Sequence, residues 1–155
     1  MKTIDLSWRQ IEKLVSVLVR KIHKKYDVII SINRGGLILG TLLSHATKTR
    51  HGVTSIESYQ GRKKSKSHKI GHHISMIGAL SPKTRVLLVD DISDSGESLR
   101  EIFKTFEKLG CPSKNIDTAT LHYKTRSCFE PTYYAKRIND YDWVNYPWER
   151  FKGND

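Results

Sequence analysis

The sequence predicts an α/β protein with a central, mainly parallel sheet flanked by helices. Segments in which apolar residues recur at helical spacing alternate with short apolar runs typical of buried strands. This alternation favours a parallel sheet, because each helix can serve as the crossover between two strands. The chain has 155 residues, which fits a single domain over residues 1–155 with a sizeable core.

The first predicted helix begins after Ser7, which together with Gln10 forms a capping-box pattern. The apolar residues that follow share one helical face: Ile11, Leu14, Val15, Leu18, Val19 and Ile22. We expect this face to pack on the sheet.

A buried strand is predicted at 26–32, followed by the turn "NRGG" and a helix at 37–48. A second strand is predicted at 53–58. Residues 59–73 are polar and basic without apolar periodicity, which indicates a loop, and 73–79 is a candidate strand beyond it.

Residues 84–90 form the most hydrophobic strand, which we therefore place at the centre of the sheet. The next helix begins near Glu97 and ends at Gly110, a residue suited to a C-cap. Its apolar face comprises Leu99, Ile102, Phe103, Phe106 and Leu109. Further strands are predicted at 115–123 and 132–138. In such sheets, ligands bind beyond the carboxyl ends of the strands.

Composition restricts the class of protein. Lysine and arginine number 27 against 16 acidic residues, giving a net charge of +11 that points either to anionic partners or to a basic solvated surface. No apolar run approaches a membrane span, and the first residues lack the apolar block of a signal peptide. Cys111 and Cys128 form no metal or disulfide pattern. We expect a cytoplasmic protein with reduced thiols and no membrane contact.

The stretch "VLLVDDISDSGESL", residues 86–99, places acids at the end of the predicted central strand. A glycine-containing turn and a helix N-terminus can bind phosphate through backbone amides. Adjacent carboxylates can bind ribose hydroxyls or Mg²⁺. An alternative is a helix capped by Asp94 or Ser95, but capping leaves Asp90 and Asp91 unexplained.

This stretch resembles the phosphoribosyl pyrophosphate signature of the type I phosphoribosyltransferases. The resemblance implies that family's fold, with a small hood formed by the terminal segments. It implies that Asp90 and Asp91 face the ribose hydroxyls and a hydrated Mg²⁺. It also implies that the turn binds the 5′-phosphate, through a set of residues comprising Ser93, Asp94, Ser95, Gly96, Glu97 and Ser98.

The stretch "INRGGLILG" resembles the pyrophosphate loop of the same family. Glycine lets the backbone approach an anion closely, and Arg34 offers a forked donor. The resemblance assigns pyrophosphate binding to Arg34, Gly35 and Gly36, with a cis peptide between Asn33 and Arg34. An ordinary glycine turn between strand and helix is the alternative.

The segment "ESYQGRKKSKSHK" resembles the mobile flap of the family. Its cations could close over pyrophosphate, neutralising charge and excluding water. The candidates are Arg62, Lys63, Lys64, Lys66 and Lys69, of which we assign Lys69 to the phosphate site. A solvated basic loop would have the same composition.

The acceptor site is indicated by "ATLHYK" and "YDWVNYPWE", which resemble the short xanthine-guanine and hypoxanthine phosphoribosyltransferases. The resemblance implies that Lys124 donates to a purine 6-oxo group and that Trp143 stacks on the base. It also implies that the backbone of Val144 pairs with the base edge. Core packing is the alternative for Trp143 and Trp148. Glu149 matches the acid of the family's Pro-Trp-acid motif, near the base or the metal.

The resemblance therefore implies transfer of the phosphoribosyl group from phosphoribosyl pyrophosphate to guanine, xanthine or hypoxanthine. The catalytic residues it implies are Asp90, Asp91, Arg34 and Asp94, with Asp94 as general base toward purine N7. Two other functions stay open: a phosphoribosyl pyrophosphate sensor that binds nucleic acid, and an enzyme for another base. Nucleic acid is the less favoured partner, because a sensor needs no base-recognition pair. Family analogy suggests a homodimer or homotetramer.

Overall fold

The computed structural model describes residues 2–55 and 80–151. Its elements, in chain order, are β1 (Thr3–Asp5), α1 (Trp8–Lys21), β2 (Val28–Asn33), α2 (Gly36–Thr47), β3 (Arg50–Ser55), β4 (Val86–Ser93), α3 (Glu97–Lys108), β5 (Ile116–Lys124), β6 (Tyr133–Ile138) and β7 (Trp143–Asn145), with short 3₁₀ helices at Ser113–Asn115 and Pro147–Arg150. Among the described residues, five strands form a parallel sheet in the order β3-β2-β4-β5-β6. The predicted α/β class, the parallel sheet and the central place of β4 are confirmed.

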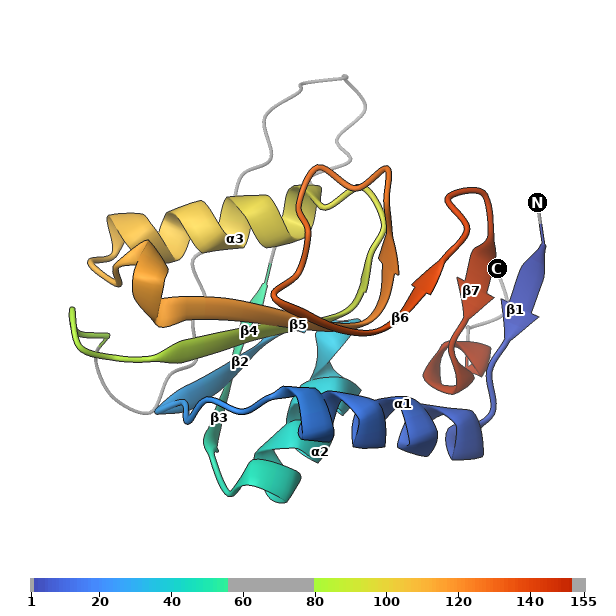
Figure 1. The fold of residues 1–155 in the computed structure, drawn as a ribbon, viewed down its shortest axis with the longest axis horizontal. Coiled ribbons are helices and arrows are strands. Elements are labelled where there is room, and N and C mark those ends of the chain that lie inside the picture. The colour runs from blue at the N-terminus through green and yellow to red at the C-terminus, as the bar shows by residue number, and fades with distance from the viewer. Residues whose placement is uncertain (1, 56–79, 152–155) are drawn as a thin grey trace.

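Helices cover both faces of this sheet. Figure 1 shows α1 and α2 on one side of the sheet and α3 on the other. Each side has its own apolar cluster, because successive strand residues point to opposite faces. In β4, Leu87 and Val89 pack toward α1 and α2, whereas Val86 and Leu88 pack toward α3.

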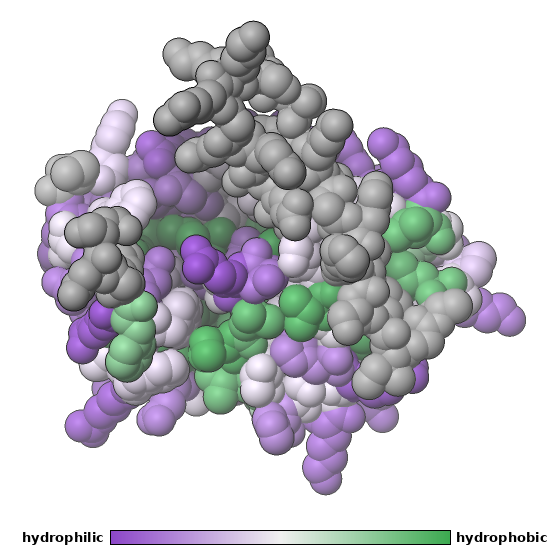
Figure 2. All heavy atoms as spheres, turned by 180° about the vertical axis from the view of Figure 1, so that it is seen from behind, coloured by the Kyte–Doolittle hydropathy of each residue, from purple (hydrophilic) through white to green (hydrophobic). Residues whose placement is uncertain are grey.

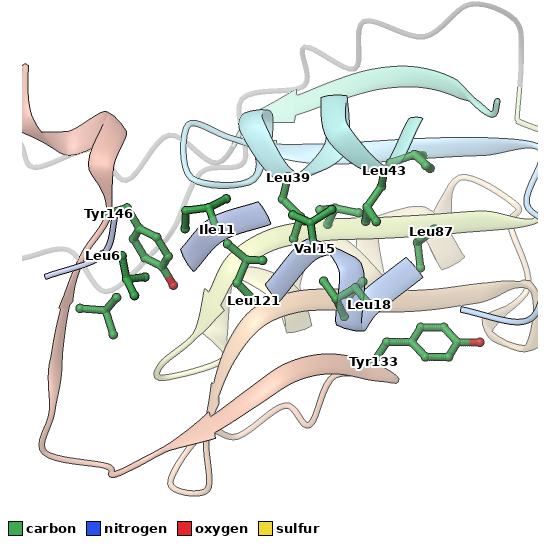
Figure 3. Close-up of a cluster of buried hydrophobic side chains, with 14 of the residues drawn as sticks. Leu6, Ile11, Val15, Leu18, Leu39, Leu43, Leu87, Leu121, Tyr133 and Tyr146 are labelled. Atoms are coloured by element: carbon green, nitrogen blue, oxygen red, sulfur yellow. The ribbon is translucent and has the colours of Figure 1, made fainter. Parts of the chain in front are cut away.

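The larger cluster joins the sheet to both terminal segments. Figure 3 shows Leu18 of α1 and Leu39 of α2 close to the strand residues Leu87 and Leu121. Leu6 and Tyr146, from opposite ends of the chain, close one end of this cluster. Burial of such side chains stabilises the fold by about 1.5–3 kcal/mol each, so the terminal segments are held by the same core as the sheet.

The predicted capping box of α1 is present. The Ser7 hydroxyl accepts a hydrogen bond from the Gln10 amide, and the Gln10 side chain accepts one from the Ser7 amide. The predicted apolar face is also buried, at Ile11, Val15 and Leu18. Local sequence and tertiary packing therefore agree on where this helix starts and which face it buries.

A hood forms where the two ends of the chain meet. Strands β1 and β7 pair in parallel, with Ile4 opposite Val144, as a separate two-stranded sheet. Figure 1 shows it at the end of the molecule where α1 begins. A hood from the terminal segments was predicted, but its strands were not, because each has three residues and no readable alternation.

Several predicted boundaries shift. The predicted strand 84–90 begins at Val86 and continues to Ser93, past the acids. The predicted strand 53–58 begins earlier, at Arg50, because pairing with β2 sets its register. The predicted loop at 59–73 and the candidate strand at 73–79 lie outside the described residues.

The surface is mixed in character. Figure 2 shows the reverse face, where hydrophilic side chains form much of the outline and apolar side chains gather in the middle. None of the helices in the described part of the chain is both long and apolar enough to cross a membrane.

Candidate active site

The predicted site residues gather at the carboxyl ends of β2, β4 and β5. From β2 the chain passes to β3 on one side of the sheet, and β4 then lies on the other side of β2. The strand order therefore reverses between β2 and β4, which is where open α/β sheets bind ligands. Arg34 follows β2, the pair Asp90–Asp91 lies near the end of β4, and Lys124 ends β5.

The loop after β2 lies directly against β4. The peptide between Asn33 and Arg34 is cis, as predicted. A side chain at Gly35 would place its Cβ 2.6 Å from Asp91 Oδ2, and one at Gly36 would collide with the Val89 carbonyl oxygen. Gly36 requires glycine because the clash is with the backbone of β4, whereas a side chain at Gly35 would displace the Asp91 carboxylate. The glycines thus bring the Arg34 backbone and Asp91 together.

Asp90 and Asp91 form a pair of like charges on adjacent residues of β4. Their one direct contact is a hydrogen bond from the Asp91 amide to Asp90 Oδ1, at 3.0 Å. Burial, and then the charge of Asp91, raise the pKa of Asp90 well above its usual value. Burial, and then the charge of Glu149, raise the pKa of Asp91 to about 7. No ion pair within residues 2–55 and 80–151 includes either acid. The pair therefore attracts a cation.

The turn between β4 and α3 leads into a helix N-terminus whose N-cap residue has no side chain. Gly96 precedes α3 with φ +79° and provides no side-chain cap. The Glu97 amide donates to the Ser95 hydroxyl at 3.3 Å, while Glu97 and Ser98 are exposed. The alternative in which Asp94 caps this helix is wrong, because Asp94 pairs with cations instead. The first turn of α3 can therefore bind an anion.

Ser93 anchors the turn to the segment that follows β5. Its hydroxyl is buried, donates to the Phe129 carbonyl at 2.8 Å and lies 2.8 Å from the Ser127 hydroxyl. The Cys128 amide donates to the Ser95 carbonyl at 2.8 Å. The segment after β5 is thereby tied to the turn, and this geometry favours an anchoring role for Ser93 over direct phosphate contact.

A second charged cluster lies three residues further along, at Asp94. Lys124, whose side chain is 3% exposed, places Nζ 3.1 Å from Asp94 Oδ2. Arg126 donates to Asp94 Oδ1 through both Nε and Nη2. Burial acts to raise the pKa of Asp94, but the hydrogen bonds from Arg126 and Lys124 outweigh it and hold this pKa below its usual value. Asp94 is therefore ionised at neutral pH.

The hood contributes Trp143 and Val144. Trp143 is 57% exposed, and its Nε1 donates to Asn145 Oδ1 at 2.9 Å. The core-packing alternative is therefore wrong for Trp143. It is right for Trp148, which packs on the core and stacks on Tyr146 with ring centroids 4.7 Å apart.

The backbone of Val144 faces away from β1. The Trp143 amide donates to the Lys2 carbonyl, and the Leu6 amide donates to the Asn145 carbonyl. In a parallel pair, alternate residues direct both backbone groups to the partner strand. Val144 lies between two such residues, so its N–H and C=O point to the opposite side. Its side chain, by contrast, is buried in the core.

Tyr146 links the hood to the acid strand. Its hydroxyl donates to the Asp91 carbonyl at 3.1 Å and lies 2.8 Å from His122 Nδ1. A phenol has one proton, and that proton goes to the carbonyl, so His122 Nδ1–H must be the donor to Tyr146. Glu149 accepts from the Tyr146 amide at 2.9 Å, which holds this acid near Asp91.

Arg126, His122 and Tyr146 were not predicted as site residues. Arg126 follows Lys124 by two residues, and a second cation just beyond a strand end was the available signal. His122 and Tyr146 carried no such signal, because their contact joins β5 to the hood across 24 residues. Lys69, the assigned flap cation, lies outside the described residues.

The chain is similar to phosphoribosyltransferases in both sequence and structure. The sequence model of the phosphoribosyl transferase domain family matches residues 2–150. A purine phosphoribosyltransferase from Pyrococcus horikoshii OT3 shares 33% identity, with a TM-score of 0.84, covering 100% of this chain and 99% of that one.

Two more distant structures share the fold. A xanthine-guanine-hypoxanthine phosphoribosyltransferase from Helicobacter pylori has 24% identity and a TM-score of 0.75, covering 95% of this chain and 94% of that one. A hypothetical protein from Neisseria gonorrhoeae with bound ppGpp has 23% identity and a TM-score of 0.74, covering 96% of this chain and 89% of that one.

The chain combines a parallel α/β sheet with an acid pair and a glycine turn at the switch point, an arrangement suited to sugar-phosphate ligands. The chain belongs to the phosphoribosyl transferase domain family. It is an enzyme, a phosphoribosyltransferase.

Proposed function

We propose that this enzyme transfers the 5-phosphoribosyl group from phosphoribosyl pyrophosphate to a 6-oxopurine: guanine, xanthine or hypoxanthine. The observation that carries the proposal is the contact between Lys124 and Asp94, at 3.1 Å. One edge of a 6-oxopurine presents an acceptor, O6, beside a donor, N7–H. A lysine ammonium beside an ionised carboxylate offers the complementary donor and acceptor.

The same pair disfavours adenine. Adenine carries an amino group at position 6, which donates where Lys124 also donates. Lys124 is nearly completely buried, so a mismatched partner could not be replaced by water, and an unpaired buried group costs about 1–3 kcal/mol. The full-length similarity to a protein named as a purine phosphoribosyltransferase supports the same class of acceptor.

The hood residues complete the base site in this proposal. The exposed Trp143 ring stacks on the base, and base–aromatic stacking contributes about 1–3 kcal/mol. The Val144 backbone groups that point away from β1 pair with the polar edge of the base. Because they are backbone groups, their directions depend on the pairing of β1 with β7 rather than on a side chain.

The sugar phosphate occupies the other half of the site. Arg34 binds the pyrophosphate group through its guanidinium fork, and the amides after Gly96 bind the 5′-phosphate. Asp90 and Asp91 accept hydrogen bonds from the ribose hydroxyls. The turn's support by Ser93 keeps these amides in place before the ligand arrives.

The acid pair fits Mg²⁺. The described residues hold no group of three or more acidic, histidine or cysteine side chains arranged for a metal. Mg²⁺, however, is commonly held by one or two carboxylates together with substrate phosphates and water. Asp90 and Asp91, two partly buried carboxylates with raised pKa values, meet that requirement. An ion held there with the substrate would supply positive charge to offset the negative charge that develops on the leaving pyrophosphate.

Arg34 and Asp94 have separate roles in the proposed reaction. Purine N9 bonds to C1′ as the bond from C1′ to the pyrophosphate oxygen breaks. Arg34 stabilises the charge on the departing group. Asp94 takes the proton from N7, so the products are a nucleoside monophosphate, pyrophosphate and a protonated Asp94, which then releases its proton to water.

The experiment is a panel of bases with phosphoribosyl pyrophosphate and Mg²⁺, followed by pyrophosphate release. We expect turnover with at least one of guanine, xanthine and hypoxanthine and none with adenine or uracil. Turnover confined to adenine or a pyrimidine would refute the acceptor assignment. No turnover, together with tight and steeply salt-dependent binding of RNA or DNA, would replace the enzyme proposal with the regulator.

A further inference from the structure

Arg126 holds one oxygen of the Asp94 carboxylate, although it lies outside the residues assigned to the base site above. It lies in the turn after β5, two residues beyond Lys124. Its guanidinium donates through Nε and Nη2 to Asp94 Oδ1, whereas Lys124 donates to Asp94 Oδ2. The two cations therefore bind different oxygens of one carboxylate.

The backbone beneath Arg126 is fixed as well. The Arg126 amide and the Thr125 hydroxyl both donate to Asp140, at 3.1 Å. Ser127, the next residue, contacts Ser93, which precedes the turn between β4 and α3 (the phosphate turn). The guanidinium thus projects from a segment that is tied on both sides, and its half-exposed position reflects an anchored turn rather than a free surface side chain.

The hydrogen bonds on the two oxygens of Asp94 decide which oxygen can accept a proton from the base. A carboxylate oxygen has about two acceptor sites. Two donors from Arg126 fill Oδ1, whereas Lys124 leaves one site on Oδ2. The remaining site lies on the oxygen that Lys124 also contacts, which is where an N7–H beside a 6-oxo group would bind.

We propose that Arg126 is a positioning residue that fixes the rotation of the Asp94 carboxylate, so that Oδ2 receives the proton of the purine. The proposal rests on the proposed function. Without Arg126, Lys124 could draw either or both oxygens, and the carboxylate could rotate away from the base. Because the guanidinium is a planar fork and ammonium is a point charge, lysine at this position cannot fix the rotation equally well.

The charged groups around Asp94 determine how the reaction rate depends on pH. Lys124 from β5 and Arg126 from the next turn face the carboxylate, with Tyr146 of the hood nearby, while Asp140 and Tyr141 lie beside Arg126. Loss of the guanidinium removes a cation that favours the ionised acid. The acidic limb of the rate profile, where Asp94 becomes protonated, then shifts to higher pH.

The experiment compares Arg126→Gln and Arg126→Lys with wild type in steady-state kinetics across pH. We expect Arg126→Gln to lower kcat/KM for the base by about 10- to 100-fold, the range for a misplaced reacting group. Its acidic limb should move upward, while the KM for phosphoribosyl pyrophosphate stays unchanged. Arg126→Lys should restore the acidic limb but not kcat.

Two controls separate positioning from other roles. Arg85→Ala removes an arginine that is also paired through two donors to an aspartate, Asp27, at the opposite end of the sheet, and it should keep wild-type kinetics. In an Asp94→Asn background, Arg126→Gln should have no further effect, because its partner no longer acts as a base. Urea unfolding of each variant checks that the fold is retained.

Three results would overturn the inference. They are normal kinetics for Arg126→Gln, a loss of the same size in the Asp94→Asn background, and full recovery of kcat in Arg126→Lys. A wild-type enzyme without purine turnover would instead refute the proposed function, so the two failures are distinguishable.

Discussion

Asp91 and Asp94 lie three residues apart, yet their surroundings are opposite. Asp91 lies beside Asp90 with no cation among the described side chains, and its pKa is raised to about 7 by burial and then by the charge of Glu149. Asp94 accepts hydrogen bonds from Lys124 and Arg126, which lower its pKa against the effect of burial. Among the described residues, Asp91 has no cationic partner, whereas Asp94 has two.

The contrast matches two kinds of ligand chemistry. In the proposed reaction, the acid pair meets a ligand that brings its own cation, Mg²⁺ with phosphoribosyl pyrophosphate. Asp94 meets a neutral base and must already be ionised and oriented before the base binds. The acid pair has no cationic partner among the described residues because its ligand would supply one. Asp94 has cationic partners in the protein because a neutral base cannot supply one.

The largest effect on activity is expected from removing the charges of Asp90 and Asp91. Asp90→Asn together with Asp91→Asn should lower kcat/KM by about 10³-fold or more, because metal and ribose contacts supply several kcal/mol. The protein should stay folded and become more stable in metal-free buffer at pH 8, since repelling charges are removed. Turnover and urea unfolding measure the two effects.

Asp27→Asn is the matched control for that variant. Asp27 lies at the amino end of β2 and pairs with Arg85, so its loss should leave turnover unchanged. Near-normal activity of the double variant at the acid pair would remove the metal and ribose roles of these residues.

Lys124→Ala should have the next largest effect on activity. It removes one of the two cations that pair with Asp94. This change leaves a 6-oxo group without its donor, which costs about 1–3 kcal/mol, or about 5- to 150-fold in kcat/KM for the base. The KM for phosphoribosyl pyrophosphate should change little, because that ligand binds at Arg34 and the phosphate turn. Equal effects on both substrates would contradict the division of the site.

Tyr146→Phe tests the support behind the acid strand. The phenol donates to the Asp91 carbonyl and accepts from His122, so its loss leaves the buried His122 ring and the part-buried Asp91 carbonyl without this partner. We expect a fall in unfolding free energy of about 1–3 kcal/mol, measured by urea titration. Tyr141→Phe is the control, since Tyr141 is 74% exposed and should change stability little. Unchanged stability of Tyr146→Phe would show that water replaces the phenol.

A further expected effect is a pH dependence of stability. The folded pKa of Asp91 is about 7, against an ordinary value of 3.8, so the folded protein keeps a proton that the unfolded chain loses. The stability contributed by this group is full below about pH 4 and is lost as pH rises through about 7. Asp91→Asn lacks this dependence.

The measurement is urea unfolding of Asp91→Asn and wild type in EDTA at pH 5 and pH 8. Asp91→Asn should gain stability relative to wild type at the higher pH, and added Mg²⁺ should narrow the difference by binding the folded wild type. The same difference at both pH values would show that Asp91 is ionised in the folded state throughout this range.

Much of the site was predictable because its parts are local. The sequence 86–99 places acids at a strand end and glycine before a helix, and both features depend on neighbouring residues. The capping box at Ser7 and the apolar face of α1 were predictable for the same reason. The length of β4 was not, because its last residues are held in the strand by pairing with β5.

The sequence by itself determined which residue types stand at each strand end, because the α/β pattern and the turns are set by local spacing and conformational preference. The tertiary structure alone decided which of those ends meet. Lys124 and Arg126 reach Asp94 across some 30 residues, Tyr146 reaches Asp91 across 55, and β1 pairs with β7 across the whole chain. Strand order and packing set such distances, so similar acids at Asp91 and Asp94 acquire opposite charge environments.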